Sequence, residues 1–299
     1  MPRKPKLIAI VGPTSSGKTD LSIAVARLIN GEIISTDSRQ IYRELNIGAG
    51  KVTKKEMHGV PHHLLNIANA KRTISVAQYQ RLAKKAIQNI LKKNKTPILC
   101  GGTGLYVDSI LTNQSFPAVP PNTKLRKVLA KLSATELFNR LNKIDPARAK
   151  TIDAKNPHRL IRAIEIATAL GSVPLLKPAE PEYESLIIGL TLSREELQLR
   201  IHKRLMIRLR RGMVAEARNL HAKGLSWKRM EALGLDYRYL AQFLQGKIQK
   251  NEMIHRIEKE NWLYAKRQMV WFKRNKNILW FSPKESKKIL TLAKNFITK

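Results

Sequence analysis

The chain has 299 residues, 43% of them hydrophobic, so it can bury a large core in two domains or in one domain with an insertion. Its 56 lysines and arginines against 22 aspartates and glutamates give a net charge of +34, which favours a polyanionic partner, nucleic acid before membrane lipid, with adaptation for solubility as the alternative. One cysteine, Cys100, excludes an internal disulfide and a cysteine-rich zinc site, and without a signal peptide or a run of about 18 apolar residues we expect a cytoplasmic protein with no membrane contact.

The first predicted elements are an apolar strand over residues 7–11 and a helix over residues 20–29. Between them, glycines let backbone N–H groups surround phosphate oxygens, the helix N-terminus adds partial positive charge, and Lys18 adds a full one. The Thr19 hydroxyl suits a Mg²⁺ ion shared with the phosphates. We therefore predict a phosphorylated ligand; the alternative is a tight glycine turn without one. The turn matches the phosphate-loop pattern G-x-x-x-x-G-K-[S/T] at Gly12, Pro13, Thr14, Ser15, Ser16, Gly17, Lys18 and Thr19.

The next elements continue the alternation of strand and helix. A second strand over residues 32–36 ends in the polar residues 37–40, and a helix is predicted over residues 75–93. A third strand over residues 96–100 leads through a glycine turn, residues 101–106, into another helix. This pattern predicts an α/β fold with a doubly wound parallel sheet, whose ligands bind at the carboxyl ends of the strands.

Proline-rich stretches flank a segment that reads as helices only. Three prolines within residues 116–122 mark its start. We predict a P-loop α/β catalytic core with C-terminal helices, residues 1–115 and 184–299, and a helical insertion domain, residues 116–183. A fourth strand over residues 186–192 is expected to rejoin the sheet.

The remaining predicted elements are helices with a strongly basic surface. Arg200, Arg204 and Arg208 recur every four residues and so share one helix face, where they suit phosphate groups. Aromatic residues near the C-terminus can stack on unpaired bases or anchor the core. The predicted helices of the insertion and the C-terminal part cover residues 124–131, 134–142, a piece from 145, 157–170, 194–211, 214–223, 237–244 and 251–273.

The predicted site lacks the acid with which an ordinary NTPase holds magnesium at the end of an apolar strand. The third strand ends in Leu99 and Cys100, followed by two glycines. The only carboxylate at a strand end is that of Asp37, after the second strand. Asp37 is therefore free to act as a general base or to help position a metal. Capping of the following helix is the alternative for this residue.

Nine blocks of residues together resemble one known family. The phosphate loop alone is widespread, but Asp-Ser-x-Gln, Gly-Gly-Thr-Gly-Leu-Tyr and Ala-Lys-Arg-Gln in one chain are close to diagnostic. The blocks are Gly12–Thr19, Asp37–Tyr42, Asn46–Gly48 with Lys51, Gly59–Leu64, Gly101–Tyr106, Asp145-Pro146, Arg159–Glu165, Arg200–Arg204, and Tyr264–Gln268 with Trp271-Phe272. In these blocks the chain is similar to the tRNA dimethylallyltransferases (isopentenylpyrophosphate:tRNA transferases).

The resemblance implies transfer of a dimethylallyl group from dimethylallyl diphosphate to N6 of the adenosine immediately 3′ of the anticodon (tRNA nucleotide 37), in tRNAs that read codons beginning with U. The product is N6-(dimethylallyl)adenosine. The phosphate loop would hold the diphosphate leaving group, which explains the missing strand acid. Lys18, Thr19, Mg²⁺ and Arg204 would stabilise the charge on the departing diphosphate. Asp37 would take the proton from the amine of a flipped adenine.

The resemblance also implies a tRNA-binding surface, on which the insertion domain and the basic C-terminal helices clamp the anticodon stem-loop. We expect a monomer with Mg²⁺ as cofactor. A small-molecule kinase with a helical lid is the main alternative, and a non-catalytic RNA-binding protein with a vestigial phosphate loop is another. The implied tRNA-binding residues are Asp37, Ser38, Arg39, Gln40, Thr103, His158, Arg159, Leu160, Ile161, Arg162, Lys266, Arg267 and Gln268.

Several positions depart from the usual pattern of this family. None removes the proposed base or the phosphate clamp, so we expect the departures to affect RNA contacts and not the reaction. The usual Asp-Ile-Gly-Thr-Ala-Lys-Pro of the family is replaced by Asn-Ile-Gly-Ala-Gly-Lys-Val at residues 46–52, and the usual Asn-Asp is replaced by Lys155-Asn156. The usual Gly-Tyr is replaced by Gly234-Leu235-Asp236-Tyr237, the usual Thr-Arg by Asn261-Trp262, and a methionine by Arg208.

Overall fold

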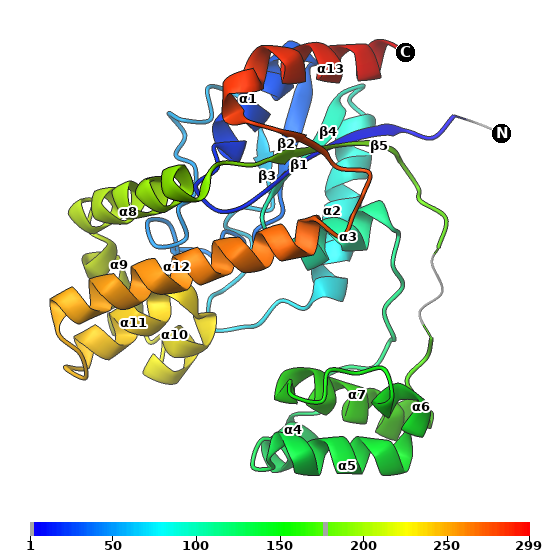
Figure 1. Cartoon of the computed structure of the whole chain (residues 1–299), viewed down its shortest axis with the longest axis vertical. Helices are drawn as coiled ribbons and strands as arrows, with labels where there is room; N and C mark the ends of the chain where they lie inside the picture. Colours follow the sequence, from blue (N-terminus) through cyan, green and yellow to red (C-terminus); the bar gives the residue numbers. More distant parts are fainter. Residues whose placement is uncertain (1–2, 176–178) are drawn as a thin grey trace. The chain divides into compact units, whose positions relative to one another are not determined.

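The computed structural model describes residues 3–175 and 179–299 and divides into two compact units. Unit 1 comprises Met1–Asn113 and Glu180–Lys299, and unit 2 comprises Gln114–Ala179. Figure 1 shows both units, with unit 2 as the green group of helices. No helix in the described part of the chain is long and apolar enough to cross a membrane.

Unit 1 is built on a six-stranded sheet with the order β3-β2-β4-β1-β5-β6. Every pair of neighbouring strands is parallel, as the alternation of strands and helices predicts. The strands are β1 (Lys6–Val11), β2 (Gly31–Ser35), β3 (His62–His63), β4 (Thr96–Gly101), β5 (Glu184–Leu190) and β6 (Leu279–Phe281).

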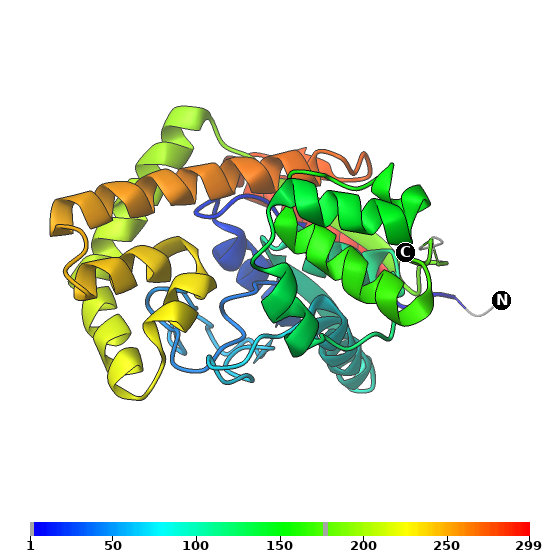
Figure 2. The ribbon, with the colours of Figure 1, turned by 90° about the horizontal axis from the view of Figure 1, so that it is seen from below.

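Helices cover both faces of this sheet, and the remaining ones form a C-terminal group. Figure 2 shows α12 running alongside α11 in that group. The helices of unit 1 are α1 (Lys18–Leu28), α2 (Val76–Leu91), α3 (Gly104–Leu111), α8 (Arg194–Arg210), α9 (Met213–Ala222), α10 (Trp227–Leu233), α11 (Leu235–Leu244), α12 (Lys250–Phe272), the short 3₁₀ helix η1 (Pro283–Glu285) and α13 (Ser286–Thr298).

The two faces of the sheet bury two different hydrophobic clusters because side chains alternate along each strand. Leu7 and Ala9 of β1 lie in one cluster with residues of α2 and α3, whereas Ile8 and Ile10 lie in the other with residues of α1 and α13. The sheet is therefore doubly wound, as predicted.

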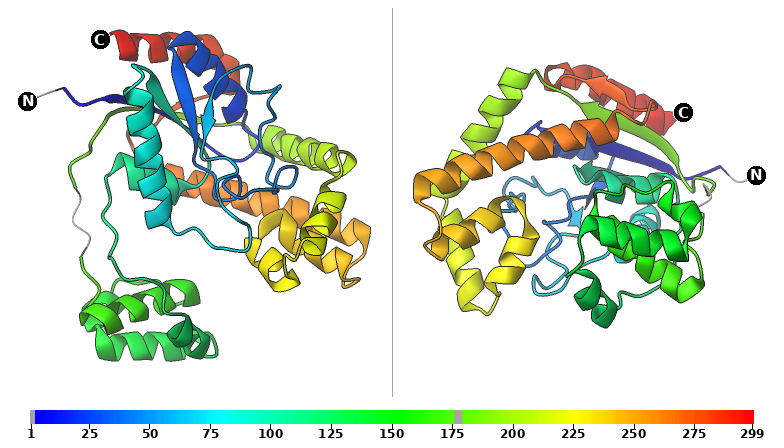
Figure 3. Two further views of the ribbon diagram at one scale, coloured as in Figure 1. Left: turned by 180° about the vertical axis from the view of Figure 1, so that it is seen from behind. Right: turned by 60° about the horizontal axis from the view of Figure 1, so that its bottom comes forward.

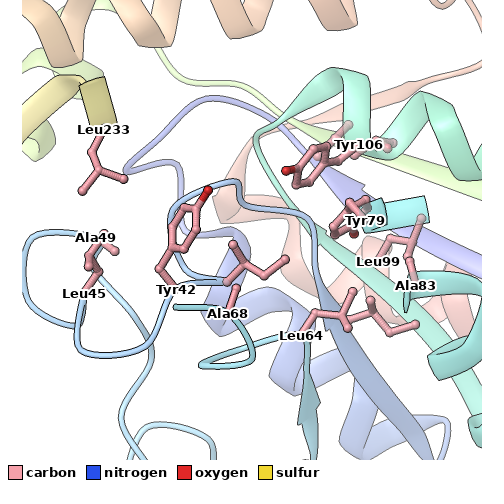
Figure 4. Packing of buried hydrophobic residues seen from close by; sticks show 14 of the residues in the cluster. Tyr42, Leu45, Ala49, Leu64, Ala68, Tyr79, Ala83, Leu99, Tyr106 and Leu233 are labelled. Carbon is pink, nitrogen blue, oxygen red and sulfur yellow. The ribbon is translucent and has the colours of Figure 1, made fainter. Parts of the chain in front are cut away.

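The larger cluster contains a stacked pair of tyrosines beside the end of β2. The rings of Tyr79 and Tyr106 lie 3.8 Å apart between centroids, at 13° (Figure 4). The Tyr79 hydroxyl donates to the backbone oxygen of Ser35 at 3.1 Å. This bond fixes the carboxyl end of β2, two residues before Asp37.

Unit 2 is a small helical body with its own core. Glu165 is buried within it and accepts hydrogen bonds from Arg126, Arg162 and the backbone N–H of Asn122. These bonds join α4 and the segment before it to α7. The helices of unit 2 are α4 (Thr123–Leu129), α5 (Ala134–Ile144), α6 (Pro146–Ala149) and α7 (Pro157–Leu170).

Five elements were not predicted from the sequence: β3, β6, α10, η1 and α13. The strand β3 has two residues, too few for any periodicity. Its His63 is held by Glu32 at 2.7 Å, and the same buried carboxylate binds Lys93 and Lys95. The helix α13 is rich in lysine but places Ile289 and Ala293 in the sheet core.

Candidate active site

The phosphate loop lies between β1 and α1, at the carboxyl end of the central strand. Gly12 has φ +140°, and a Cβ there would come within 2.6 Å of the Leu190 backbone oxygen. Gly17 has φ +91° and caps α1 at its N-terminus. Glycine is required at both positions, since a side chain would collide at Gly12 and be strained at Gly17.

Lys18 folds back over the phosphate loop. Its Nζ donates to the backbone oxygen of Pro13 and lies 3.4 Å from the Ser16 hydroxyl. Burial, with a smaller contribution from the nearby charge of Arg204, lowers the pKa of Lys18 to about 8. A bound anion would reverse this effect, so the site is electrostatically suited to a phosphorylated ligand.

Gln268 of α12 connects the two glycine turns of the site. Its Oε1 accepts from the Thr14 N–H at 2.8 Å, and its Nε2 donates to the Gly102 oxygen at 2.9 Å. The side chain is 5% exposed, so both ends of the amide are engaged within the protein. Gln268 was predicted to bind tRNA, but in the structure it supports the phosphate loop.

Asp37 begins a tight turn at the end of β2. Its Oδ1 accepts from the backbone N–H groups of Arg39 at 2.8 Å and Gln40 at 3.3 Å. Asp37 therefore has the capping role that the sequence offered as an alternative, through Oδ1 only, and the segment that it caps is a turn and not a helix. No hydrogen bond within the described residues engages Oδ2, which is available to a ligand.

Thr103 ties the turn after β2 to the turn after β4. Its hydroxyl accepts from the Ser38 N–H at 3.1 Å, and its backbone N–H donates to the Thr36 oxygen at 3.1 Å. The Thr103 side chain is also hydrogen-bonded to Tyr264, whose pKa burial raises to about 12. The predicted residues Asp37, Ser38 and Thr103 thus form one connected group.

Arg204 reaches the site from α8. Its Nη1 donates to the Thr14 hydroxyl and its Nη2 to the Gly50 oxygen, both at 3.2 Å. The neighbouring charge of Arg208 and, to a lesser extent, burial lower the pKa of Arg204 to about 9. Figure 3 shows how α8 and α12 meet, and buried Leu197 and Ala265 belong to their shared cluster.

Two adjoining cavities open on these residues. The first has a volume of about 100 Å³ and is lined by Asp37, Gln40 and Tyr264 among others. The second, about 800 Å³, is lined by the phosphate loop and by basic side chains such as Arg200 and Lys203. A carboxylate therefore lies on one side and a phosphate-binding loop on the other. The residues that line both cavities are Lys18, Thr19, Val52, Arg204 and Arg208.

The predicted tRNA-binding residues of unit 2 differ in exposure. His158 and Arg159 are exposed near the N-terminus of α7, and Ile161 is partly exposed. Leu160, also predicted to bind tRNA, is 0% exposed and belongs to the core of unit 2, so its side chain is not available to tRNA in this structure. Arg162 donates to Glu165 at 3.3 Å and to the Val119 oxygen at 2.9 Å.

The predicted tRNA-binding residues of α12 lie beside aromatic rings. Lys266 and Arg267 are exposed. The Lys266 Nζ lies 5.9 Å from the centroid of the Trp262 ring, and the Arg267 guanidinium lies equally far from that of Tyr264. These side chains combine positive charge with π faces, which suits an RNA surface.

Sequence reasoning missed Glu216, which holds the loop of residues 46–51. Its carboxylate accepts from three successive backbone N–H groups, those of Asn46, Ile47 and Gly48, at 2.7–3.0 Å. It also accepts from the Tyr237 hydroxyl at 2.8 Å. Glu216 lies in the first turn of α9, where nothing in the sequence distinguishes it from a solvent-exposed glutamate.

The donors for a metal ion at this site are few. Thr19 is exposed and borders both cavities. Among the described residues, no group of three or more histidine, cysteine, aspartate or glutamate side chains could hold a metal ion. This donor set suits Mg²⁺ that takes most of its ligands from phosphate oxygens and water.

The fold and the site define a phosphate-loop α/β protein with a carboxylate across the cavity from the loop. The IPP transferase family model matches residues 40–275. The chain is 41% identical over 272 residues to tRNA dimethylallyltransferase 2 of Citrifermentans bemidjiense, covering 91% of this chain and 88% of that protein. It is 40% identical to tRNA dimethylallyltransferase of Syntrophomonas wolfei, covering 98% and 96%.

Solved structures agree with these relatives. The full-length tRNA isopentenylpyrophosphate transferase from Bacillus halodurans superposes with a TM-score of 0.75 at 34% identity, covering 99% of this chain and 97% of that one. A eukaryotic dimethylallyltransferase acting on tRNA shares the fold, with a TM-score of 0.82 at 24% identity, over 98% and 80% of the two chains. The chain belongs to the IPP transferase family, the tRNA dimethylallyltransferases, as the motifs indicate.

Proposed function

We propose that this chain transfers a dimethylallyl group from dimethylallyl diphosphate to N6 of the adenosine 3′-adjacent to the anticodon. The observation that carries the proposal is the pairing of a phosphate loop with Asp37 across two adjoining cavities, in a member of this family. The names of the relatives support the reaction class, and the two adjoining cavities support separate positions for the two substrates.

The donor diphosphate would bind in the larger cavity. The phosphate loop, Lys18 and Arg204 border that cavity, and all three favour negative charge. Charge grows on the diphosphate as its bond to the allylic carbon breaks. Groups already aimed at this position stabilise the transition state more than the bound substrate, so they accelerate the departure.

A magnesium ion fits this arrangement, with Thr19 as its protein ligand. When bound, it would neutralise part of the charge on the diphosphate. The protein's own part is to hold the leaving group by backbone N–H groups and by the two cations Lys18 and Arg204.

The acceptor adenine would enter the smaller cavity from an unstacked position in the tRNA. Its N6 lone pair forms the new C–N bond to the allylic carbon, and the C–O bond to the diphosphate breaks. The amine then loses one proton, which Asp37 accepts through Oδ2. Oδ1 stays bound to the turn, so the carboxylate is held in place while it does so.

Exposed basic and aromatic residues supply a surface for the anticodon stem-loop. Lys266 and Arg267 on α12 are available in unit 1, and His158 and Arg159 on α7 in unit 2. The net charge of +34 favours such a polyanion. The same charge, and the lack of an acid at the end of β4, argue against the kinase alternative.

Incubation with dimethylallyl diphosphate, Mg²⁺ and unmodified tRNA tests the proposal. Digestion to nucleosides and mass analysis should reveal N6-(dimethylallyl)adenosine, located 3′ of the anticodon by sequencing of the RNA fragments. A tRNA with guanosine at that position is the control and should stay unmodified. Unchanged adenosine in the first tRNA would contradict the proposal.

A further inference from the structure

Two arginines of α8, not one, line both cavities of the site. Arg204 and Arg208 are one helical turn apart and each lines both cavities. The Arg208 side chain is only 12% exposed. It is therefore part of the site and not of the outer surface.

Arg208 is held in a fixed orientation by one other helix, α11, and by the loop of residues 46–51. Its Nη1 donates to Asp236 Oδ2 at 2.8 Å and to the Gly48 oxygen at 3.3 Å. Asp236 is itself buried, and its second oxygen accepts from the Asn261 side chain at 2.5 Å. A guanidinium anchored at one nitrogen in this way presents its remaining N–H groups in a set direction.

The free side of Arg208 lacks a partner. Its Nε is buried and has no hydrogen bond within the described residues. A buried donor without an acceptor is rare in a protein unless a ligand accepts its hydrogen bond. The same side chain belongs to the lining of the cavity in which the diphosphate would bind.

The positive charges of Arg204 and Arg208 are also only partly balanced by nearby carboxylates. Two guanidinium groups meet here, and of the nearby carboxylates only Asp236 is hydrogen-bonded to either of them among the described residues. Like charges in a buried site repel strongly unless an anion lies between them. A diphosphate carries the charge and the oxygen acceptors that both arginines need.

The residues that make this arrangement possible coincide with departures from the family pattern. A Cβ at Gly50 would overlap Nη2 of both arginines, so glycine makes room for the pair. Gly50, Arg208, Asp236 and Asn261 all stand where the pattern has other residues. The expectation that the departures concern RNA contacts alone is therefore incomplete, because these four meet at the phosphate site.

We propose that Arg208 is a second arginine of the leaving-group site and binds the diphosphate together with Arg204. The inference rests on the proposed function, since it assigns the ligand of the same cavity. It adds Arg208 to the leaving-group site, for which the family resemblance names only Arg204, and it agrees with the phosphate-binding helix face expected from the sequence.

Calorimetric binding of inorganic pyrophosphate with Mg²⁺, in the absence of tRNA, tests this inference. The double variant Arg208→Met with Asp236→Asn removes both charges, so neither is left buried and unpaired. Its affinity for pyrophosphate should fall by about tenfold to a hundredfold, as loss of charge-assisted hydrogen bonds predicts. The control, Arg256→Met, breaks an exposed pair with Glu252 outside both cavities and should bind as the wild type does.

Each result decides between a ligand contact and a structural ion pair. Unchanged affinity in the double variant would overturn the inference, as would an equal loss of affinity for tRNA measured without pyrophosphate. If the wild type itself binds no pyrophosphate, the proposed function fails and the inference with it. If the double variant does not fold, Arg208→Lys serves instead: it keeps the charge but loses the planar fork, so affinity should fall by about threefold or more, and unchanged affinity would overturn the inference.

Discussion

The Thr14 backbone N–H donates to the side-chain oxygen of Gln268 at 2.8 Å, across 254 residues of sequence. The other end of the same amide holds Gly102. One side chain of α12 therefore sets the spacing between the phosphate loop and the turn after β4. This contact explains how a C-terminal helix, distant in sequence, controls the geometry of an N-terminal loop.

Replacement of Gln268 by methionine should loosen the phosphate loop. It removes the partner of the partly buried Thr14 N–H and of the buried Gly102 oxygen, which we expect to destabilise the protein by about 1–3 kcal/mol. Urea denaturation measures this loss, and pyrophosphate affinity should fall as well. Lys259→Met, at an exposed position of the same helix, is the control. Equal stability of the two variants would show that the Gln268 amide contributes little to holding the phosphate loop in place.

Asp37→Asn separates the two roles of this side chain. Asparagine keeps an oxygen for the N–H groups of Arg39 and Gln40, so the turn should persist. It cannot accept a proton from the adenine, so single-turnover transfer should slow by about 10²–10⁴-fold. Rapid-quench kinetics with saturating tRNA measures this rate. A rate near that of the wild type would leave Asp37 with its turn-capping role alone.

Lys18→Ala should abolish transfer while tRNA affinity stays nearly intact. The pKa of Lys18 is about 8 in the free protein, so its charge is present below that pH and lost above it. The advantage of the wild type over Lys18→Ala in pyrophosphate binding should therefore shrink as the pH rises through about 8. Binding titrations at several pH values measure it, and an advantage that stays constant from pH 7 to 10 would contradict the role.

The same pKa shift has an opposite effect on the stability of the ligand-free protein. The folded pKa lies below the ordinary value of 10.5, so the unfolded chain binds more protons between about pH 8 and 10.5. Relative to Lys18→Ala, the wild type should gain stability across this interval. Urea denaturation of both proteins at about pH 8 and at about pH 10.5 measures whether the stability difference between them increases with pH.

Binding of tRNA should depend steeply on salt. A chain of net charge +34 that contacts several phosphates releases counterions, and the logarithm of the association constant then falls linearly with the logarithm of the salt concentration. Fluorescence anisotropy between low and moderate salt measures the slope. Double substitution of Lys266 and Arg267 by glutamine should flatten the slope by about two if both side chains contact phosphates. An unchanged slope would place the RNA elsewhere.

The sheet and the phosphate loop could be predicted because their signals are local. Leu7–Val11 form an apolar run, and the following eight residues carry a complete motif, so neighbours in sequence determine the structure. The predicted helices of the C-terminal part were likewise close, and α12 begins and ends one residue before its prediction.

The parts that escaped prediction depend on contacts between distant residues. Glu216 and Gln268 act through bonds to loops far away in the chain. No pattern singles out Glu216, and the Ala-Lys-Arg-Gln motif identifies Gln268 without revealing its contact to the phosphate loop. Leu160 was included in the RNA surface because the family resemblance implies the whole stretch His158–Arg162, yet its own position on the helix faces the core of unit 2. A motif identifies a segment, while helix geometry decides which of its side chains are exposed.

The central claim is that the phosphate loop binds the diphosphate leaving group of dimethylallyl diphosphate and not a nucleoside triphosphate. The most direct measurement counts products in one reaction that contains tRNA, Mg²⁺, dimethylallyl diphosphate and ATP. We predict one pyrophosphate released for each dimethylallylated adenosine formed, with ATP intact. Hydrolysis of ATP or transfer of its terminal phosphoryl group, without prenylated adenosine, would contradict the claim.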